Sequence, residues 1–309
     1  MINKYILTDN YRYCSDILSL SFRDILLVLL KINQLTKLMK TKNRFLLAIT
    51  SVLLLINVTI FAQEEKKAQY YTVTTMHFNL DNDSDADWKA VEKEYMDKVT
   101  MKNDYVMNAG YYTHLYTANS TDVKYVQVYS SWEDIDKAGQ RNSELEKEAW
   151  PDETARKAFL KKQGDFYQQV HSDEIYTILP GGKSSSDPVG EDWILYVRTQ
   201  HMAYPENAPE GELGKLRTEY LENVIYKNDL IKGYYPHRHF WGHDSSEFIE
   251  AFFLESMDDL AKMNDKNGEL YQAHFKDEDA RKDFWNKISK YYTGVHGDEI
   301  YSIVSDLRK

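Results

Sequence analysis

Residues 171–178, His-Ser-Asp-Glu-Ile-Tyr-Thr-Ile, recur as residues 296–303, His-Gly-Asp-Glu-Ile-Tyr-Ser-Ile, at an offset of 296 − 171 = 125. The same offset aligns Tyr71 with Tyr196 and Lys102-Asn103-Asp104 with residues 227–229. A repeat period above ~100 residues indicates a duplicated domain rather than a solenoid. We therefore predict two tandem repeats, at 63–179 and 192–309, joined by a linker rich in Pro, Gly and Ser at 180–191.

The residues before the first repeat resemble a secretory signal. A basic run at 39–44 precedes an apolar stretch at 45–61 and the small residue Ala62, and an acidic, polar segment follows. We predict a signal peptide at 39–62 with cleavage after Ala62, and a misannotated upstream extension at 1–38. The alternative is that the apolar stretch stays as an uncleaved anchor. Cleavage predicts a secreted or periplasmic protein with no integral membrane span.

The remaining chain is acidic. The sequence has 38 basic and 49 acidic residues, of which residues 1–62 contain eight and three, so the remainder carries 30 − 46 = −16 charges. Such a surface repels phosphate backbones, which argues against nucleic acid as a partner. The single cysteine, Cys14, precedes the predicted cleavage site, so the mature protein would have neither a disulfide nor a thiolate metal ligand.

Each repeat shows the same order of predicted elements. β-branched and aromatic residues at 70–78 and 193–199 predict a first strand. Apolar residues at helical spacing follow, then a hairpin at 110–130, a long helical region broken near Trp150-Pro151, and a last strand at 171–178. The order β-α-β-β-α-β is that of a ferredoxin-like sheet. The fold class is therefore α+β, with two tandem ferredoxin-like (βαββαβ) domains.

The last strand indicates how the two repeats meet. Tyr176 and Ile178 would face one side of the sheet, and Ile175, Thr177 and Leu179 the other, so neither face is plainly polar. Helices can cover one face, and the second repeat is the obvious cover for the other. We therefore expect the domains to pack sheet to sheet as a pseudo-dimeric α/β barrel, within a monomer.

This order and pairing resemble the dimeric α/β-barrel superfamily, over residues 70–179 and 192–304. In that superfamily two ferredoxin-like units stack sheet against sheet, and one chain would supply both here. The resemblance implies a ligand site inside the barrel or in the cleft between sheet and helices. Members include cofactor-free monooxygenases and haem-binding enzymes, but a fold does not fix a function.

Histidines in the second repeat form a candidate metal site. His237 and His239 are two residues apart on a predicted strand and would share one face, with His201 or His243 as a third ligand. Only His239 has a counterpart in the first repeat, His114. No carboxylate completes a recognisable ligand pattern, so polar aromatics on a half-buried strand are the favoured interpretation.

Two further patterns allow a binding or a structural interpretation. His171 and His296 precede carboxylates and suit a general base, but their presence in both repeats favours a structural joint. Arg198 would lie on a covered sheet face, paired with an acid such as Glu299 or with a ligand carboxylate.

Two hypotheses for function follow. The first is a secreted protein that binds a small apolar or aromatic ligand inside the barrel without a cofactor. Its polar contacts would be His114, His239, Arg198, Tyr176 and Tyr301. The second is an enzyme of the dimeric α/β-barrel type, either a cofactor-free oxygenase or a protein that uses haem or a divalent metal through His237, His239 or His201.

Overall fold

The computed structural model describes residues 67–82, 86–185, 188–190 and 192–309. The predicted upstream extension at 1–38 and signal peptide at 39–62 lie outside these residues. In the described part of the chain, no helix combines the length and the apolar character needed to cross a bilayer.

The described residues form two halves with the same order of elements. The first half contains β1 (Tyr70–His77), α4 (Trp88–Lys98), β2 (Asn108–Tyr116), β3 (Asp122–Tyr129), α5 (Trp132–Ala149), α6 (Glu153–Gly164) and β4 (Ser172–Ile178). The second half contains β5 (Ile194–Met202), α7 (Glu212–Tyr220), β6 (Gly233–Trp241), β7 (Glu247–Leu254), α8 (Met257–His274), α9 (Glu278–Ser289) and β8 (Tyr292–Arg308). A 3₁₀ turn, Thr100–Lys102, follows α4, and a π turn, Leu221–Ile225, follows α7.

The predicted break in the long helical region is confirmed. α5 ends at Ala149 and α6 begins at Glu153, and Pro151 between them cannot continue the helical hydrogen bonding. The second half breaks at the same place without a proline, and an aspartate, Asp152 or Asp277, caps the second helix in both halves. Ser131 at the start of α5 accepts a hydrogen bond from the backbone N–H of Asp134, and Ser256 does the same for Asp259 at the start of α8. Each serine hydroxyl thus satisfies one backbone N–H in the first turn of its helix.

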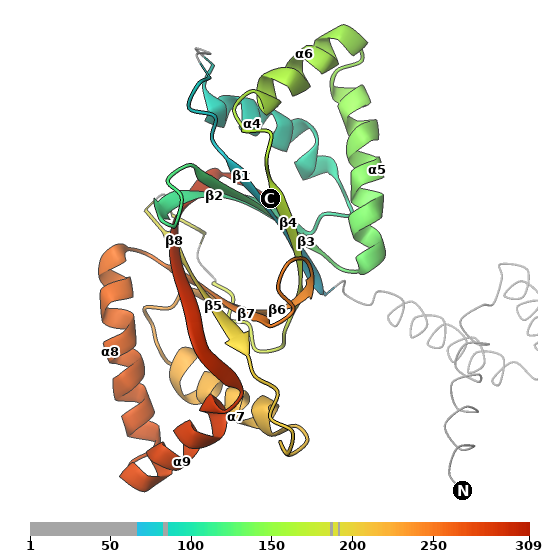
Figure 1. Ribbon diagram of the computed structural model, residues 1–309. Coiled ribbons are helices and arrows are strands. Elements are labelled where there is room, and N and C mark those ends of the chain that lie inside the picture. The colour runs from blue at the N-terminus through green and yellow to red at the C-terminus, as the bar shows by residue number, and fades with distance from the viewer. Residues whose placement is uncertain (1–66, 83–85, 186–187, 191) are drawn as a thin grey trace, which may run out of the picture. The chain divides into compact units, whose positions relative to one another are not determined.

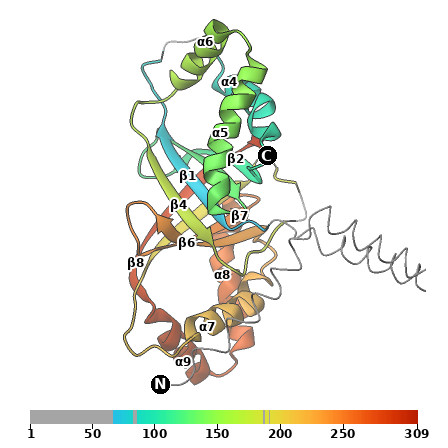
Figure 2. The ribbon, with the colours of Figure 1, turned by 90° about the vertical axis from the view of Figure 1, so that its right-hand side faces the viewer.

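The strands form one closed barrel within the described residues, in the order β1-β3-β2-β8-β5-β7-β6-β4, with β4 returning to β1 (Figures 1 and 2). The sequence predicts two sheets packed face to face. In the structure the sheet edges are also joined by hydrogen bonds, in the pairs β2–β8 and β4–β6. All the pairs are antiparallel, and closure leaves no free strand edge in the ring.

The helices cover the outside of the barrel. α4, α5 and α6 lie on one side, and α7, α8 and α9 lie on the opposite side (Figures 1 and 2). Under the first set, Met96, Tyr111 and Leu307 form part of an apolar cluster, and under the second set Leu221 and Phe252 do so. The outer face of the barrel is therefore apolar beneath the helices, and the inner face encloses the space described below.

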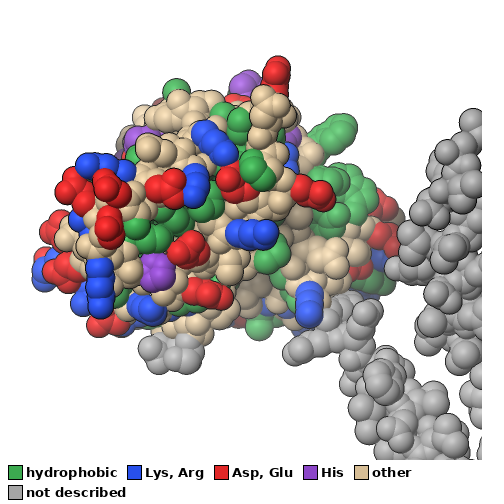
Figure 3. Space-filling view, turned by 90° about the horizontal axis from the view of Figure 1, so that it is seen from below, with side chains coloured by type: hydrophobic (Ala, Val, Ile, Leu, Met, Phe, Trp, Pro, Cys, Tyr) green, Lys and Arg blue, Asp and Glu red, His purple; other side chains and the backbone are tan. Residues whose placement is uncertain are grey.

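The outer surface carries charges of both signs. Acidic and basic side chains are interspersed on the face seen in Figure 3. Several form i,i+4 pairs along helices, such as Lys282 with Glu278 on α9. Exposed pairs of this kind contribute little to stability.

The strand register corrects the alignment of the two halves at one point. Tyr71 lies opposite Val128 in the β1–β3 pair, and Leu195 lies opposite Phe253 in the β5–β7 pair. The β3 and β7 residues differ by 253 − 128 = 125, but the β1 and β5 residues by 195 − 71 = 124. The counterpart of Tyr71 is therefore Leu195 and not Tyr196. A shift of one residue turns every side chain of a strand to the other face.

Candidate functional site in the barrel interior

The barrel encloses a cavity of about 830 Å³. Alternate residues of the strands point into it, as closure of a sheet requires; Tyr71, Val73 and Thr75 of β1 are an example. The volume lies in the range of sites that hold a small organic molecule. Apolar side chains such as Val126, Leu195 and Phe253 make up much of the wall.

The segment between the two halves forms part of the cavity wall. The sequence predicts a linker at 180–191, and its described residues Pro180, Gly182 and Val189 line the cavity. Lys183 is tied to Tyr234 of β6 by two backbone hydrogen bonds of 2.8 Å. The segment is therefore both a connection and a part of the site.

Three aromatic rings pack against one another on one side of the cavity. The rings of Tyr71 and Tyr176 are stacked with centroids 5.0 Å apart, and the His237 ring lies 4.0 Å from Tyr71 at an angle of 50°. His237 is 8% exposed, and its buried Nδ1 has no hydrogen-bond partner. Burial lowers the pKa of His237 to about 3, so its imidazole is neutral at physiological pH. His237 is the unsatisfied polar group of this wall.

The carboxylates of the cavity wall are all hydrogen-bonded. The Tyr176 hydroxyl donates to Glu247 at 2.7 Å, and the Tyr301 hydroxyl donates to Glu299 at 2.8 Å. Glu174 accepts the backbone N–H of His243 at 3.0 Å. Burial, with the nearby carboxylates, raises the pKa of both tyrosines. The two phenols therefore stay protonated and act as donors.

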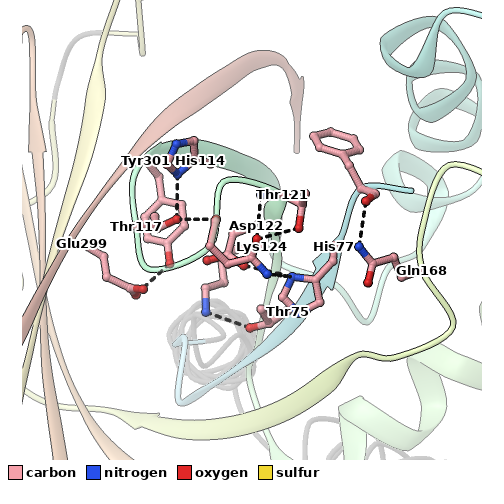
Figure 4. Close-up of polar contacts among 12 residues, drawn as sticks. Thr75, His77, His114, Thr117, Thr121, Asp122, Lys124, Gln168, Glu299 and Tyr301 are labelled. Atoms are coloured by element: carbon pink, nitrogen blue, oxygen red, sulfur yellow. Dashed lines mark hydrogen bonds and ion pairs between the residues drawn. The ribbon is translucent and has the colours of Figure 1, made fainter. Parts of the chain in front are cut away.

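Two cations also line the cavity. The Lys124 amine donates to the Thr75 hydroxyl at 2.8 Å and lies 5.9 Å from the centre of the Tyr301 ring. Figure 4 shows the Lys124–Thr75 and Tyr301–Glu299 contacts side by side in this wall. The Arg308 guanidinium donates to the Tyr112 hydroxyl at 3.0 Å.

The structure brings some of the predicted ligand-binding residues to the cavity. Tyr176 and Tyr301 line it. His239 lies opposite Tyr176 in the β4–β6 register, with ring centroids 6.2 Å apart, and its buried Nε2 is unpaired 3.9 Å from Glu174. His114 lies opposite Tyr301, but its ring is bonded to Thr117 at 2.8 Å and does not line the cavity (Figure 4).

Arg198 does not face the cavity. Its neighbours Val197 and Thr199 line the interior, so Arg198 lies on the outer face of β5. Its Nε donates to Asp298 at 3.1 Å, and not to the predicted partner Glu299, which faces inward. The expectation rested on aligning Tyr196 with Tyr71, which is shifted by one residue at this strand.

The repeated His-x-Asp motifs have a local arrangement. His171 lies 3.3 Å from Asp173, and His296 lies 3.2 Å from Asp298, with all four side chains substantially exposed. Neither histidine lines the cavity. The two motifs therefore have matching surface placements outside the cavity.

The predicted metal ligands do not converge. His201 is bonded to Ser246 at 2.9 Å and lies 3.2 Å from Asp244. Across the described residues, no group of three or more His, Cys, Asp or Glu side chains is arranged to hold a metal ion. A bound divalent metal needs such a set, so His237, His239 and His201 do not fit one.

Haem also fits this cavity poorly. His237 has a free nitrogen, but its ring packs against Tyr71 at 4.0 Å.

Sequence analysis missed several residues of the cavity wall. Glu247, Lys124, Arg308 and Trp193 line it, and none of them was predicted as a site residue. A signal existed for Glu247, which the 125-residue offset aligns with the acidic Asp122. Arg308 offered none, because β8 bulges between the residues that pair with Gly110 and Tyr112.

No protein-family model and no curated protein matches the sequence. Among solved structures, the chain is similar to a proposed monooxygenase from Fusobacterium nucleatum subsp. nucleatum, with 10% identity, 77% of this chain and 93% of that chain covered, and a TM-score of 0.50. It is also similar to a chlorite dismutase from Candidatus Nitrospira defluvii in complex with imidazole, with 11% identity, 80% and 94% covered, and a TM-score of 0.45.

The closed barrel with helices on its outside, together with the first of these similarities, defines the fold class. The chain has the fold of the dimeric α/β-barrel superfamily, as the sequence predicts. At 10% identity the similarity concerns the fold and not the reaction.

Proposed function

We propose that this chain is an enzyme of the dimeric α/β-barrel type that oxidises a small hydroxylated aromatic molecule inside the barrel without a metal ion. The observation that carries the proposal is the unpaired Nδ1 of His237 in the cavity wall. A buried polar atom without a partner costs about 1–3 kcal/mol, so a ligand hydroxyl that bonds to it gains that stabilisation. Apolar walls and stacked tyrosines suit an aromatic ring.

The neutral state of His237 defines its role. With its pKa lowered to about 3, the imidazole accepts a hydrogen bond from a ligand hydroxyl instead of acting as a cation. The polarised hydroxyl makes the ring more electron-rich. A methylene beside such a ring can react with dioxygen: its two C–H bonds break, a C=O bond forms with one oxygen atom, and the other leaves as water with both hydrogens.

The enzyme reading draws support from the fold similarity to a proposed monooxygenase. That support is analogy, since one fold hosts many activities. A second candidate is a carrier that binds the same ligand without reaction. The carboxylates of the wall favour the carrier. Glu174, Glu247 and Glu299 each already accept a hydrogen bond from the protein, so none of them is free to act as a base on a ligand.

The origin and location of the protein are part of the proposal. We infer that the two halves are copies of one ferredoxin-like domain, because they share their element order and their capping serines. Since one chain closes the barrel, we expect a monomer. The predicted signal peptide at 39–62 supports a secreted or periplasmic location.

The test uses 1,8-dihydroxyanthrone, which has phenolic hydroxyls and an oxidisable methylene. The purified protein is treated with a chelator, binding is measured by calorimetry, and oxygen uptake is measured with an electrode. We expect oxygen consumption equal to product formed, and a loss of about tenfold in affinity in His237→Phe, the value of one hydrogen bond. His201→Ala is the control, because His201 does not line the cavity.

The outcomes separate the candidates. Binding that depends on His237 without oxygen uptake above the uncatalysed rate would support the carrier. No binding of this or related hydroxylated aromatics would contradict both. Equal losses in His237→Phe and His201→Ala would remove the role assigned to His237.

A further inference from the structure

The charged groups of the cavity differ in how they are satisfied. Each of the three carboxylates, Glu174, Glu247 and Glu299, accepts a hydrogen bond from the protein. Among the described residues, neither Lys124 nor Arg308 has a carboxylate within ion-pair distance, although both line the same cavity. The two cations of the cavity therefore have no ion-pair partner in the described part of the protein.

Arg308 is the better placed of the two cations to take an anion. Its guanidinium lies 5.7 Å from the centre of the Tyr112 ring and 5.6 Å from that of Phe253. One nitrogen, Nη1, donates to the Tyr112 hydroxyl at 3.0 Å. Stacking on aromatic rings fixes the plane of a guanidinium, and a planar fork of donors matches a carboxylate.

The strand opposite Arg308 leaves room for the guanidinium. Gly110 faces Arg308 in the β2–β8 register and lines the cavity. A methyl group added at Gly110 would lie 3.4 Å from Nη1 of Arg308, in van der Waals contact. The guanidinium thus packs over bare backbone. Lys124 also donates to a hydroxyl, that of Thr75, but its ammonium is a single point charge without a planar fork of donors.

We propose that the ligand of this cavity carries a carboxylate that pairs with Arg308, in addition to the hydroxyl that bonds to His237. This inference rests on the proposed interior site and names its substrate class: a hydroxylated fused-ring aromatic carboxylic acid. Arg308 is then a residue that determines specificity, and the wall carboxylates exclude acids that present their charge elsewhere in the cavity.

The positions of the two anchors indicate an elongated ligand. Arg308 lies by Phe253, and His237 lies opposite Ile249, both on β7. Four residues along a strand span about 13 Å at ~3.3 Å per residue. A single ring with adjacent substituents is too short to reach both anchors. A fused-ring system with substituents at opposite ends comes close to this span of about 13 Å.

Three matched probes test the inference: 2-naphthol, 6-hydroxy-2-naphthoate and 6-hydroxy-2-naphthamide. Calorimetry at pH 7.5 should show that the acid binds at least tenfold more tightly than the amide, as expected for a charge-assisted pair. Arg308→Gln should abolish that difference and leave 2-naphthol binding within about twofold. Arg198→Gln, which alters an arginine of the outer face, should leave all three affinities unchanged.

The results distinguish this inference from the proposed function. If 2-naphthol binds through His237 but the acid gains nothing over the amide, or keeps its gain in Arg308→Gln, the carboxylate inference is wrong and the interior site stands. If the acid binds through Arg308 but His237→Phe changes nothing, the inference holds and the role of His237 fails. If no probe binds the wild-type protein, both are wrong. The wild-type comparison of acid with amide decides the question even if Arg308→Gln does not fold.

Discussion

The two halves of the barrel share the buried hydrogen bonds that stabilise the fold, and they differ in the residues of the cavity wall. Asn103 and Asn228 are both fully buried, and each bonds to equivalent partners 125 residues apart. At the cavity wall, the residue 125 positions before His237 is Tyr112, which bonds to Arg308. The contacts that both halves share stabilise the fold. The cavity-wall residues that differ between the halves indicate one site in the barrel and not two.

A second difference lies under the first helix of each half. Glu92 on α4 is 1% exposed and accepts hydrogen bonds from Tyr111, Tyr167 and Gln163, each at 2.7–2.8 Å. The offset of 125 aligns it with Arg217 on α7, which lies over the Phe248 ring at 4.5 Å and leaves a buried Nη2 unpaired. The same position thus holds opposite charges, one fully satisfied and the other not.

The largest expected effect tests this difference. Glu92→Ala should cost about 3–5 kcal/mol of unfolding free energy, because it leaves three donors without an acceptor, one of them, the Tyr111 hydroxyl, fully buried. Arg217→Ala should cost only about 1 kcal/mol, since it removes stacking on Phe248 but no complete hydrogen-bond set. Urea unfolding measures both. Glu92→Gln, which keeps one acceptor oxygen, is the control and should lie between them. Equal losses for the two alanine variants would mean that the buried charges are energetically equivalent.

The next effect tests the agreement between the halves. Asn103→Ala and Asn228→Ala should each cost about 2–3 kcal/mol, because each amide joins the end of the first helical segment to the next helix through buried hydrogen bonds. Asn103 reaches Ala138 and Asn142, and Asn228 reaches Met263 and Asn267. The two losses, measured by urea unfolding, should agree within about 0.5 kcal/mol. A large discrepancy would show that matching contacts in the two halves do not carry matching energies.

The element order was predictable because its signals are local. The capping serines, the break at Pro151 and the alternating strands can all be read within a few residues. The closure of the ring was not, because the β2–β8 pair joins residues almost 200 positions apart, such as Thr113 and Ser302. No local pattern records whether two sheets only stack or also join at their edges.

The candidate site was predictable only in part. Tyr176 and Tyr301 were identified from the repeated motif, and strand alternation carries them to the interior. Arg198 was misplaced because the second half has an extra residue between β5 and β6, which an alignment anchored further along the chain does not detect. Arg308 was missed because a bulge sets its position, and bulges have no reliable sequence signal here.

The next effect is a pH dependence of stability that comes from the second half alone. The first half has Tyr112 in place of His237. His237 has its pKa lowered to about 3 in the folded state, below its ordinary value of about 6.5. The unfolded chain therefore binds a proton between these values that the folded chain does not, and stability falls as the pH drops below about 6.5. From pH 7 to pH 5 the wild-type protein should lose about 2 kcal/mol more than His237→Phe.

Urea unfolding at both pH values measures this loss. Tyr112→Phe, at the corresponding position of the first half, is the matched control and should keep the wild-type pH dependence, because it removes a hydroxyl and no imidazole. If the wild-type protein and His237→Phe show the same slope with pH, His237 is not held neutral by burial. The hydrogen-bond role proposed for it would then lose its physical basis.

The smallest effect concerns the capping serines and bears on the origin of the two halves. Ser131→Ala and Ser256→Ala each remove one hydrogen bond, of 3.2 Å in both cases, from the first turn of an 18-residue helix. Each should cost about 1 kcal/mol. The two caps are far apart, so the double variant should lose the sum of the two. Additive, equal losses would support two copies that keep independent helix starts in one barrel, whereas a double loss well above the sum would mean that the halves unfold through a shared contact.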